Sequence, residues 1–176
     1  MFDDRQILSR LYLFREVSSS ALMQLCSVAP PVQYEAGAEV FRQGDSADSA
    51  LLVVEGRLIA SVQGSGGEKI VGDSKAGEIV GETALFAKEM RRGATVMAAE
   101  PSRCLVVDRQ LLNKTDGNEA LAAIERHLLG TMARRIRKTN QTMQMVWKEM
   151  TPSEPTEPLD APSLLQRLGS LFKGKL

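Results

Sequence analysis

Histidine, cysteine and tryptophan are scarce in this sequence, whose 176 residues include one His, two Cys and one Trp. One histidine and two separated thiols cannot assemble a nucleophile–base pair or a cluster of metal ligands, so we expect neither an enzyme nor a metal protein. An iron–sulfur cluster usually takes four cysteines, which argues against that cofactor as well. Cys26 and Cys104 stand in apolar stretches, as buried thiols of a reducing compartment do.

Long apolar runs and an excess of one charge are also missing. No segment reaches the roughly 18 apolar residues that a membrane helix needs, and the acidic start MFDDRQIL lacks a signal-peptide core. We therefore predict a cytoplasmic protein. Lys and Arg together number 22, as do Asp and Glu, so no overall positive field attracts DNA.

The first two segments differ in the spacing of their apolar residues. Residues 1–30 predict short helices that end before the pair Pro30-Pro31. In residues 31–113, short apolar runs alternate with glycine turns, which predicts a β sandwich or barrel. The expected fold class is α+β: a mainly β jelly roll with N-terminal helices. Gly37, Gly44 and Gly56 stand where a tight turn needs positive φ.

Residues 114–150 predict a long helix, because one Gly and no Pro occur from Glu119 to Met150. At 1.5 Å per residue this helix is roughly 45 Å long. Its apolar positions alternate in steps of three and four, which is nearly a coiled-coil repeat. We expect this stripe to form a parallel homodimer, and the alternative is that it packs on its own roll. This heptad stripe comprises Leu121, Ile124, Leu128, Met132, Ile136, Thr139, Met143, Val146 and Met150.

The last two segments are a linker and a tail. Residues 151–162 contain four prolines and predict an extended linker. Residues 163–176 are amphipathic and are interpreted as packing on the roll, as docking to an unidentified protein partner, or as a weak contact with a membrane surface. Linker and tail are too short for a helix-turn-helix domain, so we expect no DNA-binding domain here.

The segment Gly77–Val96, GEIVGETALFAKEMRRGATV, carries the strongest chemical pattern. A predicted helical turn follows Gly81, and its free backbone amides and positive dipole end favour an anion. Gly81, Thr83 and Ala84 are small enough to let that anion approach the backbone.

Two charged residues complete this pattern. The guanidinium fork of Arg92 can hold two phosphate oxygens, and Glu82 can accept a hydrogen bond from a ribose hydroxyl. No Walker loop and no carboxylate cluster for Mg²⁺ is present, so the pattern predicts a nucleotide with one cyclic phosphate diester. The alternative is a structural ion pair between Glu82 and Arg92.

The order of segments and this pattern resemble the cyclic-nucleotide-binding domain of catabolite-activator-type regulators, kinase regulatory subunits and gated channels. The resemblance covers roughly residues 8–149. It is carried by Gly81-Glu82-Thr83-Ala84-Leu85 and Arg92-Gly93-Ala94-Thr95, which match the two halves of the family's phosphate-binding cassette. Gly93 departs from the pattern, since Ser or Ala is common there.

The resemblance implies that the ligand is cAMP. It implies Glu82 at the ribose 2′-hydroxyl, Arg92 at the cyclic phosphate, and the amides of Thr83 and Ala84 beside that phosphate. It also implies that Val71 and Val80 line the pocket of the base.

The long helix adds a second resemblance. The run ARRIRKTNQT, Ala133–Thr142, resembles the dimer helix of the catabolite activator, where a Thr-Ser pair contacts adenine. This implies that Thr139 and Asn140 contact the base, one from each subunit. Asn140 replaces the family's Ser, and the alternative for Thr139 is a polar position that sets the register of the dimer.

The sequence thus predicts a cAMP-binding regulatory or adaptor protein that signals through its dimer helix and tail to a protein partner. Three alternatives stay open: a protein that binds cyclic di-GMP, a dimeric interaction module without ligand, and a transcription regulator that works with a separate DNA-binding subunit. The residues do not separate cAMP from cGMP.

Overall fold

The structure is a computed structural model that describes residues 4–29, 31–86, 89–113 and 117–150, so the predicted linker and tail lie outside the described residues. The chain forms two units, residues 1–132 and 133–176. Its helices are α1 (Asp4–Arg10), η1 (Tyr12–Phe14), α2 (Ser19–Val28), η2 (Glu82–Leu85), α3 (Arg109–Leu112) and α4 (Glu119–Met150). Its strands are β1 (Pro31–Tyr34), β2 (Glu39–Phe41), β3 (Ser46–Ala47), β4 (Ser49–Glu55), β5 (Arg57–Gly64), β6 (Gly67–Lys75), β7 (Ile79–Val80), β8 (Met90–Arg91), β9 (Thr95–Ala98) and β10 (Ser102–Asp108).

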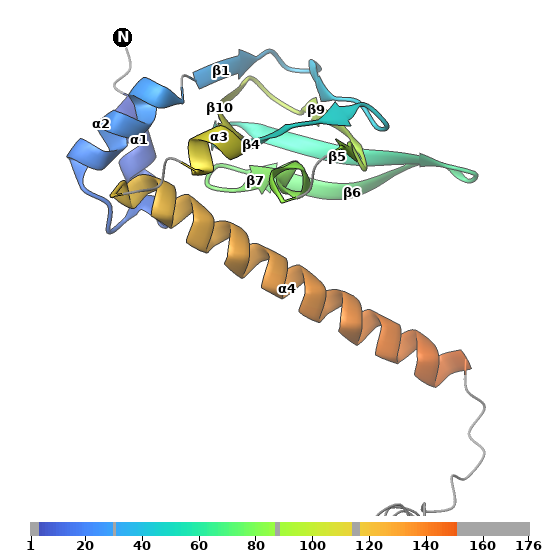
Figure 1. Ribbon diagram of the computed structural model, residues 1–176. Helices are drawn as coiled ribbons and strands as arrows, with labels where there is room; N and C mark the ends of the chain where they lie inside the picture. The colour runs from blue at the N-terminus through green and yellow to red at the C-terminus, as the bar shows by residue number, and fades with distance from the viewer. Residues whose placement is uncertain (1–3, 30, 87–88, 114–116, 151–176) are drawn as a thin grey trace, which may run out of the picture. The chain divides into compact units, whose positions relative to one another are not determined.

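Two four-stranded antiparallel sheets build the first unit (Figure 1), in the orders β1-β10-β4-β7 and β2-β9-β5-β6. The predicted fold class, a mainly β jelly roll with N-terminal helices and a long C-terminal helix, is confirmed. The sequence analysis missed β3 and β8, which pair with each other. Each has two residues, and a run that short shows no periodicity.

Strand β4 is apolar along nearly its whole length because both of its faces are covered. Successive side chains of a strand point to opposite faces. Leu52 and Val54 therefore join a core shared with the helices, which we call the helix-side core, whereas Leu51 and Val53 join a core between the two sheets, which we call the inter-sheet core. Each of these four residues is at most 3% exposed.

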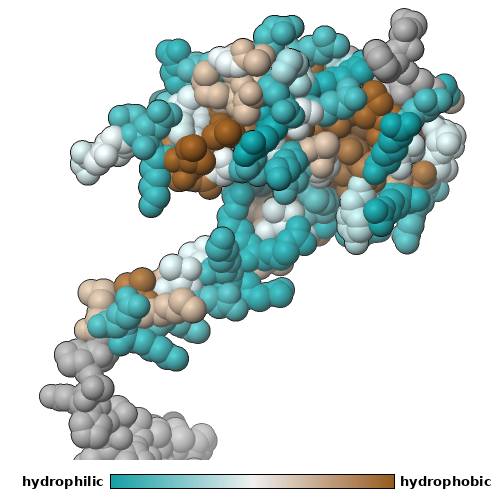
Figure 2. Space-filling view, turned by 180° about the vertical axis from the view of Figure 1, so that it is seen from behind, coloured by the Kyte–Doolittle hydropathy of each residue, from teal (hydrophilic) through white to brown (hydrophobic). Residues whose placement is uncertain are grey.

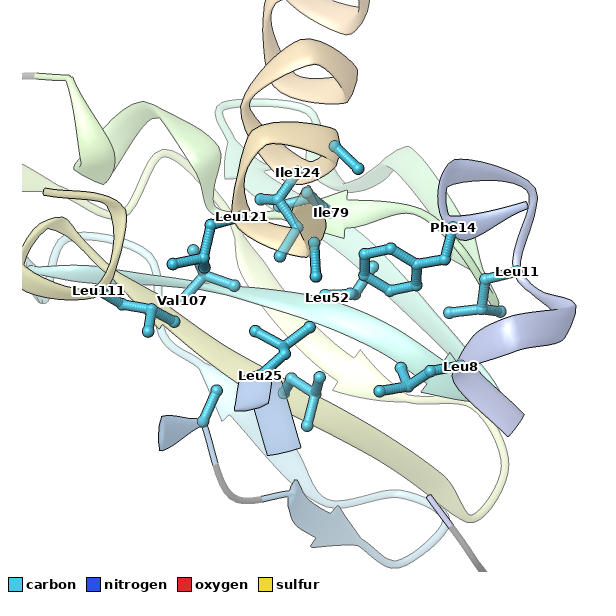
Figure 3. Close-up of a cluster of buried hydrophobic side chains, with 14 of the residues drawn as sticks. Leu8, Leu11, Phe14, Leu25, Leu52, Ile79, Val107, Leu111, Leu121 and Ile124 are labelled. Carbon is cyan, nitrogen blue, oxygen red and sulfur yellow. The ribbon is translucent and has the colours of Figure 1, made fainter. Parts of the chain in front are cut away.

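The helix-side core explains why short helices precede the roll. Their apolar residues pack with the sheet that contains β4 and β10, with α3 and with the first turns of α4 (Figure 3). Burying such side chains contributes about 1.5–3 kcal/mol each before the loss of conformational entropy is counted. The labelled members are Leu8, Leu11, Phe14, Leu25, Leu52, Ile79, Val107, Leu111, Leu121 and Ile124.

Polar side chains cap the helices and connect α2 to α4. The Asn118 carboxamide oxygen accepts hydrogen bonds from the backbone N–H groups of Ala120 and Leu121, at 2.9 and 3.2 Å. The Ser18 backbone N–H donates to the Glu119 carboxylate at 3.0 Å, and this bond is the main cause that lowers the pKa of Glu119. The Ser18 hydroxyl in turn caps α2. The hydrogen bond between Ser18 and Glu119 therefore joins the N-terminal ends of α2 and α4.

The heptad stripe of α4 changes its surroundings along the helix. Leu121, Ile124 and Leu128 are buried in the helix-side core. In the second unit, the described residues from Ala133 to Met150 are all exposed, with Ile136 61% and Met150 73% exposed. Figure 2 shows apolar residues gathered near the C-terminal end of α4. Within the described residues, no helix is long and apolar enough to span a membrane.

Gly56 lies between β4 and β5, and its substitution is predicted to destabilise the roll. It has φ +88°, and an added Cβ would overlap the Ser102 hydroxyl and lie 2.6 Å from the Pro101 carbonyl oxygen. We expect Gly56→Ala to lower the free energy of unfolding by at least about 2 kcal/mol, from the left-handed backbone and the overlap together. Urea denaturation measures this change.

Gly44 supplies the matched control, because its φ is +91° but an added Cβ meets no atom within 4 Å. Gly44→Ala should therefore lose only about 1 kcal/mol, the cost of the backbone conformation. Equal losses for the two variants would contradict the account of Gly56.

Candidate functional site

Gly81 turns the chain from the sheet into the cassette. β7 pairs with β4, with Val80 opposite Leu51. Gly81 then adopts φ 78° and ψ 18°, a left-handed conformation, and η2 begins at the next residue. A residue with a side chain would be strained here. The glycine is therefore needed to present η2 at the end of β7.

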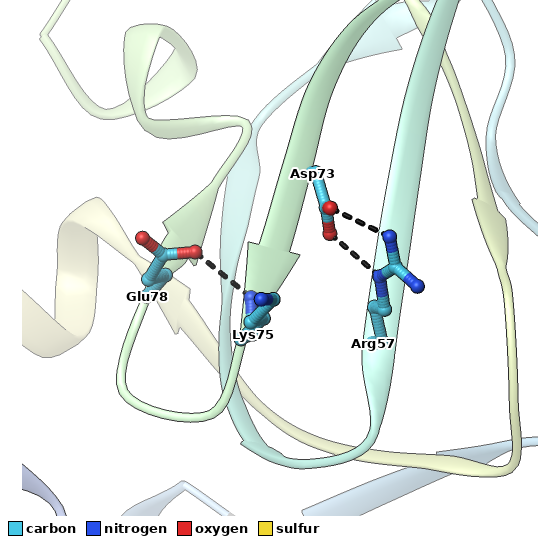
Figure 4. Close-up of polar contacts among 4 residues, drawn as sticks. All are labelled: Arg57, Asp73, Lys75 and Glu78. Atoms are coloured by element: carbon cyan, nitrogen blue, oxygen red, sulfur yellow. Dashed lines mark hydrogen bonds and ion pairs between the residues drawn. The ribbon is translucent and has the colours of Figure 1, made fainter.

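The approach to this turn is fixed by polar contacts (Figure 4). The Arg57 guanidinium donates to both carboxylate oxygens of Asp73 across β5 and β6, at 2.8 and 2.7 Å. The Glu78 carboxylate accepts from the Lys75 backbone N–H at 2.8 Å, and the Glu78 N–H donates to the Lys75 carbonyl at 3.0 Å. The two bonds between Glu78 and Lys75 close the turn between β6 and β7, whereas the Arg57–Asp73 pair links β5 to β6. The sequence analysis did not identify these four residues.

Backbone hydrogen bonds hold Arg92 in place. Its N–H donates to the Asp45 carbonyl and its carbonyl accepts from the Gly44 N–H, both at 2.8 Å. Arg92 follows β8, whose pairing with β3 places Arg91 opposite Ser46. Arg92 thus lies between β8 and β9, which begins at Thr95.

The Arg92 side chain is buried, being 8% exposed. Its Nη1 donates to the Ser49 carbonyl at 2.7 Å, and its guanidinium carbon lies 3.5 Å from the centroid of the Phe41 ring. Burial lowers the pKa of the Arg92 guanidinium, and the negative charges of Asp48 and Asp45 oppose that shift. An arginine is not deprotonated in proteins at neutral pH, so the site carries a buried positive charge.

Arg91 contrasts with its neighbour. It is exposed, and its Nη1 donates to the Gly44 carbonyl at 2.7 Å. A buried guanidinium among preformed partners is better placed to bind an anion than a solvated one. This difference favours Arg92 over Arg91 as the phosphate ligand, and the assignment stays a prediction.

Helix η2 presents the other half of the cassette. Glu82 is 5% exposed, Ala84 is fully buried and Thr83 is exposed. The Ala84 N–H donates to the Gly81 carbonyl at 3.2 Å. The amide predicted to bind phosphate therefore already has a partner within the turn, and a ligand would have to share or replace it.

The Arg109 side chain connects α3 to η2, a contact that was not predicted from the sequence. Its Nε and Nη2 both donate to the Ala84 carbonyl, at 3.1 and 2.9 Å. Arg109 is the first residue of α3, which Asp108 caps by accepting from the Leu111 N–H at 2.7 Å. No local pattern reveals this pairing, because the two residues are 25 positions apart.

The remaining predicted site residues have different surroundings. Val80 is half-buried and packs against the inter-sheet core, whereas Val71 is exposed on β6. Gly93 is exposed, and an added Cβ there would meet nothing within 4 Å. Thr139 and Asn140 belong to the second unit and are exposed on α4. Their contacts with a base stay predictions.

Side chains that could bind a metal ion do not cluster within residues 4–29, 31–86, 89–113 and 117–150. No group of three or more His, Cys, Asp or Glu side chains there could hold a metal ion. Cys26 and Cys104 form no disulfide, and burial raises the pKa of the Cys104 thiol to about 11.

A family model, curated proteins and solved structures match parts of this chain. Residues 31–115 match the family described as cyclic nucleotide-binding domain. Acetyltransferase Pat of Mycolicibacterium smegmatis is 39% identical over 102 residues, which are 58% of this chain and 30% of Pat. The CRP-like cAMP-activated global transcriptional regulator of Mycobacterium tuberculosis is 27% identical over 139 residues, which are 78% of this chain and 61% of that protein.

A solved structure supports the same grouping. The Catabolite Activator Protein of Thermus thermophilus matches with a TM-score of 0.65 and 25% identity, over 76% of this chain and 62% of that one. This chain spans less than two thirds of the length of these relatives.

Substitution of Gly81 is predicted to displace the buried guanidinium. An added Cβ would lie 2.6 Å from Arg92 Nη1 and 3.0 Å from Cε2 of Phe41. We expect Gly81→Ala to lose about 1–2 kcal/mol of unfolding free energy to its left-handed backbone and to break the hydrogen bond from Arg92 to Ser49. Urea denaturation and the NMR shifts of the Arg92 guanidinium report the two effects. Gly93→Ala is the control and should change neither.

Proposed function

We propose that this chain, whose residues 31–115 match the cyclic nucleotide-binding domain family, is a regulatory protein whose ligand is cAMP. The observation that carries this proposal is the buried Arg92 guanidinium, held beside the left-handed Gly81 at the start of the cassette. The choice of cAMP is supported by the relative from Mycobacterium tuberculosis, which is described as cAMP-activated.

In this proposal, charged side chains and neutral backbone amides of the cassette contact different parts of the ligand. Arg92 pairs with the cyclic phosphate through charge-assisted hydrogen bonds. Glu82 accepts from the ribose 2′-hydroxyl, and the backbone amides of Thr83 and Ala84 donate to the phosphate. Gly93 leaves open space beside it.

The base is assigned to apolar and polar neighbours. Val71 and Val80 line its pocket, and Thr139 and Asn140 hydrogen-bond its edge. Hydroxyl and carboxamide groups both donate and accept, as the edge of a purine requires.

The response to the ligand is proposed to pass to α4. The double hydrogen bond from Arg109 to the Ala84 carbonyl ties η2 to α3, so a shift of η2 on binding moves α3. The exposed part of the heptad stripe pairs with a second copy of the chain. The tail, residues 163–176, then docks to a protein partner in the cytoplasm, and the chain has no catalytic activity.

Removal of the Arg92 guanidinium should weaken binding. Each charge-assisted hydrogen bond contributes roughly 1.5–3 kcal/mol, so we expect Arg92→Ala to lower cAMP affinity at least tenfold. Isothermal titration calorimetry of the full chain measures this, with cGMP and cyclic di-GMP titrated in parallel.

The control is Arg91→Ala, which removes the adjacent but exposed guanidinium. It should leave cAMP affinity within about threefold, because exposed charges contribute little. Unchanged affinity in Arg92→Ala would refute the phosphate role of Arg92. Tighter binding of cyclic di-GMP than of cAMP would overturn the choice of ligand.

A charge in the heptad stripe should separate the proposed dimer. Met143 lies in the stripe and is 64% exposed, whereas Met145 lies outside it and is 65% exposed. We expect Met143→Glu to raise the dimer dissociation constant at least about tenfold, because pairing would bury the carboxylate. Sedimentation equilibrium measures this constant. Met145→Glu should change it little, and a monomeric wild-type chain would end the dimer proposal.

A further inference from the structure

The Phe41 ring lies against the guanidinium that the proposed function assigns to the phosphate. We propose that Phe41 is a positioning residue for ligand binding: its ring holds the Arg92 guanidinium in the plane and rotation that suit a cyclic phosphate. This inference rests on the proposed function.

Groups from two distant parts of the chain, residues 41–49 and Gly81, meet Arg92 at this point. Phe41 ends β2 opposite Val96 of β9, and its ring centroid lies 3.5 Å from the Arg92 guanidinium carbon. The Ser49 carbonyl, at the start of β4, accepts from Arg92 Nη1 at 2.7 Å. The site of a Cβ on Gly81 lies 3.0 Å from Phe41 and 2.6 Å from Arg92 Nη1. The ring therefore lies between the sheet and the start of the cassette.

The geometry of a guanidinium explains what the ring contributes. Its five N–H donors lie in the plane of the group, whereas its flat faces donate nothing. An aromatic ring that covers one face attracts the cation and leaves the donors at the edge available. Because Ser49 takes only Nη1, the stack on Phe41 fixes the plane in which the other donors point.

This arrangement reduces the loss of side-chain freedom on binding. A free arginine would lose much of its side-chain conformational entropy when it is ordered on an anion. Here the ring and the carbonyl order it beforehand. Lysine could not replace Arg92, because an ammonium group has no planar face and no fork.

The competing explanation is that Phe41 only fills space, since it also packs against the inter-sheet core. Leucine keeps apolar volume but has no π face, and tyrosine keeps the face. We therefore compare Phe41→Leu and Phe41→Tyr in the full chain, each with Arg92 and with Arg92→Lys. The affinity for cAMP is measured by calorimetry, and thermal denaturation reports stability.

We expect Phe41→Leu to weaken cAMP binding about tenfold when Arg92 is present, within the range of a desolvated cation–π contact. In the Arg92→Lys background the same substitution should change affinity less than about twofold, because the planar stack is already lost. Phe41→Tyr should stay within about threefold of wild type. The NMR signals of the Arg92 guanidinium should show the upfield ring-current shift in wild type and Phe41→Tyr, and lose it in Phe41→Leu.

The outcomes separate this inference from the function on which it rests. Unchanged affinity in Phe41→Leu, or an equal loss in both backgrounds, would overturn the positioning role while leaving cAMP binding intact. A wild-type chain that does not bind cAMP would instead overturn the proposed function.

Discussion

The buried charge of Arg92 is the constraint on which the rest of the site depends. Taking a cation out of water is unfavourable unless polar partners replace its hydration. Here the Ser49 carbonyl accepts a hydrogen bond from the guanidinium, and the Phe41 ring lies against it. The negative charges of Asp45 and Asp48 favour its charged form. A group that is buried, charged and oriented before any ligand arrives suits an anion that brings one negative charge.

The backbone around Arg92 also makes room for the buried guanidinium and fixes its position. The left-handed Gly81 leaves room for the guanidinium, since any Cβ would reach Nη1. The hydrogen bonds of Arg92 with Gly44 and Asp45 fix its main chain to the turn after β2. Residues 41–49 and Gly81, which lie far apart in the sequence, thus converge on the Arg92 side chain, because strands that are not consecutive in the chain are neighbours in both four-stranded sheets. The same roll brings Ala84 to Arg109 and so links the cassette to α3.

The sequence predicts those parts of the molecule that depend on local patterns. Positive φ at Gly37, Gly44 and Gly56 follows from single glycines and their neighbours, and all three are found. The choice of Arg92 within the pair Arg91-Arg92 follows from a motif. Phe41 and Arg109 could not be predicted, because their roles arise from contacts between residues far apart in the chain. In the sequence, Phe41 cannot be distinguished from any other apolar residue of a strand.

Helix α4 shows how one spacing can meet two environments. The heptad stripe continues through Met132 in steps of three or four residues, yet Leu121, Ile124 and Leu128 lie in the helix-side core whereas Ile136 and Met143 are exposed. Periodicity reports that a face needs an apolar partner and not which chain supplies it. The first turns of α4 are held by the core and by Asn118, so in the proposed function a signal from the cassette reaches α4 by way of α3. The flexible methionines of the exposed turns pack adaptably, which suits the proposed function, in which the pairing of α4 changes with the ligand.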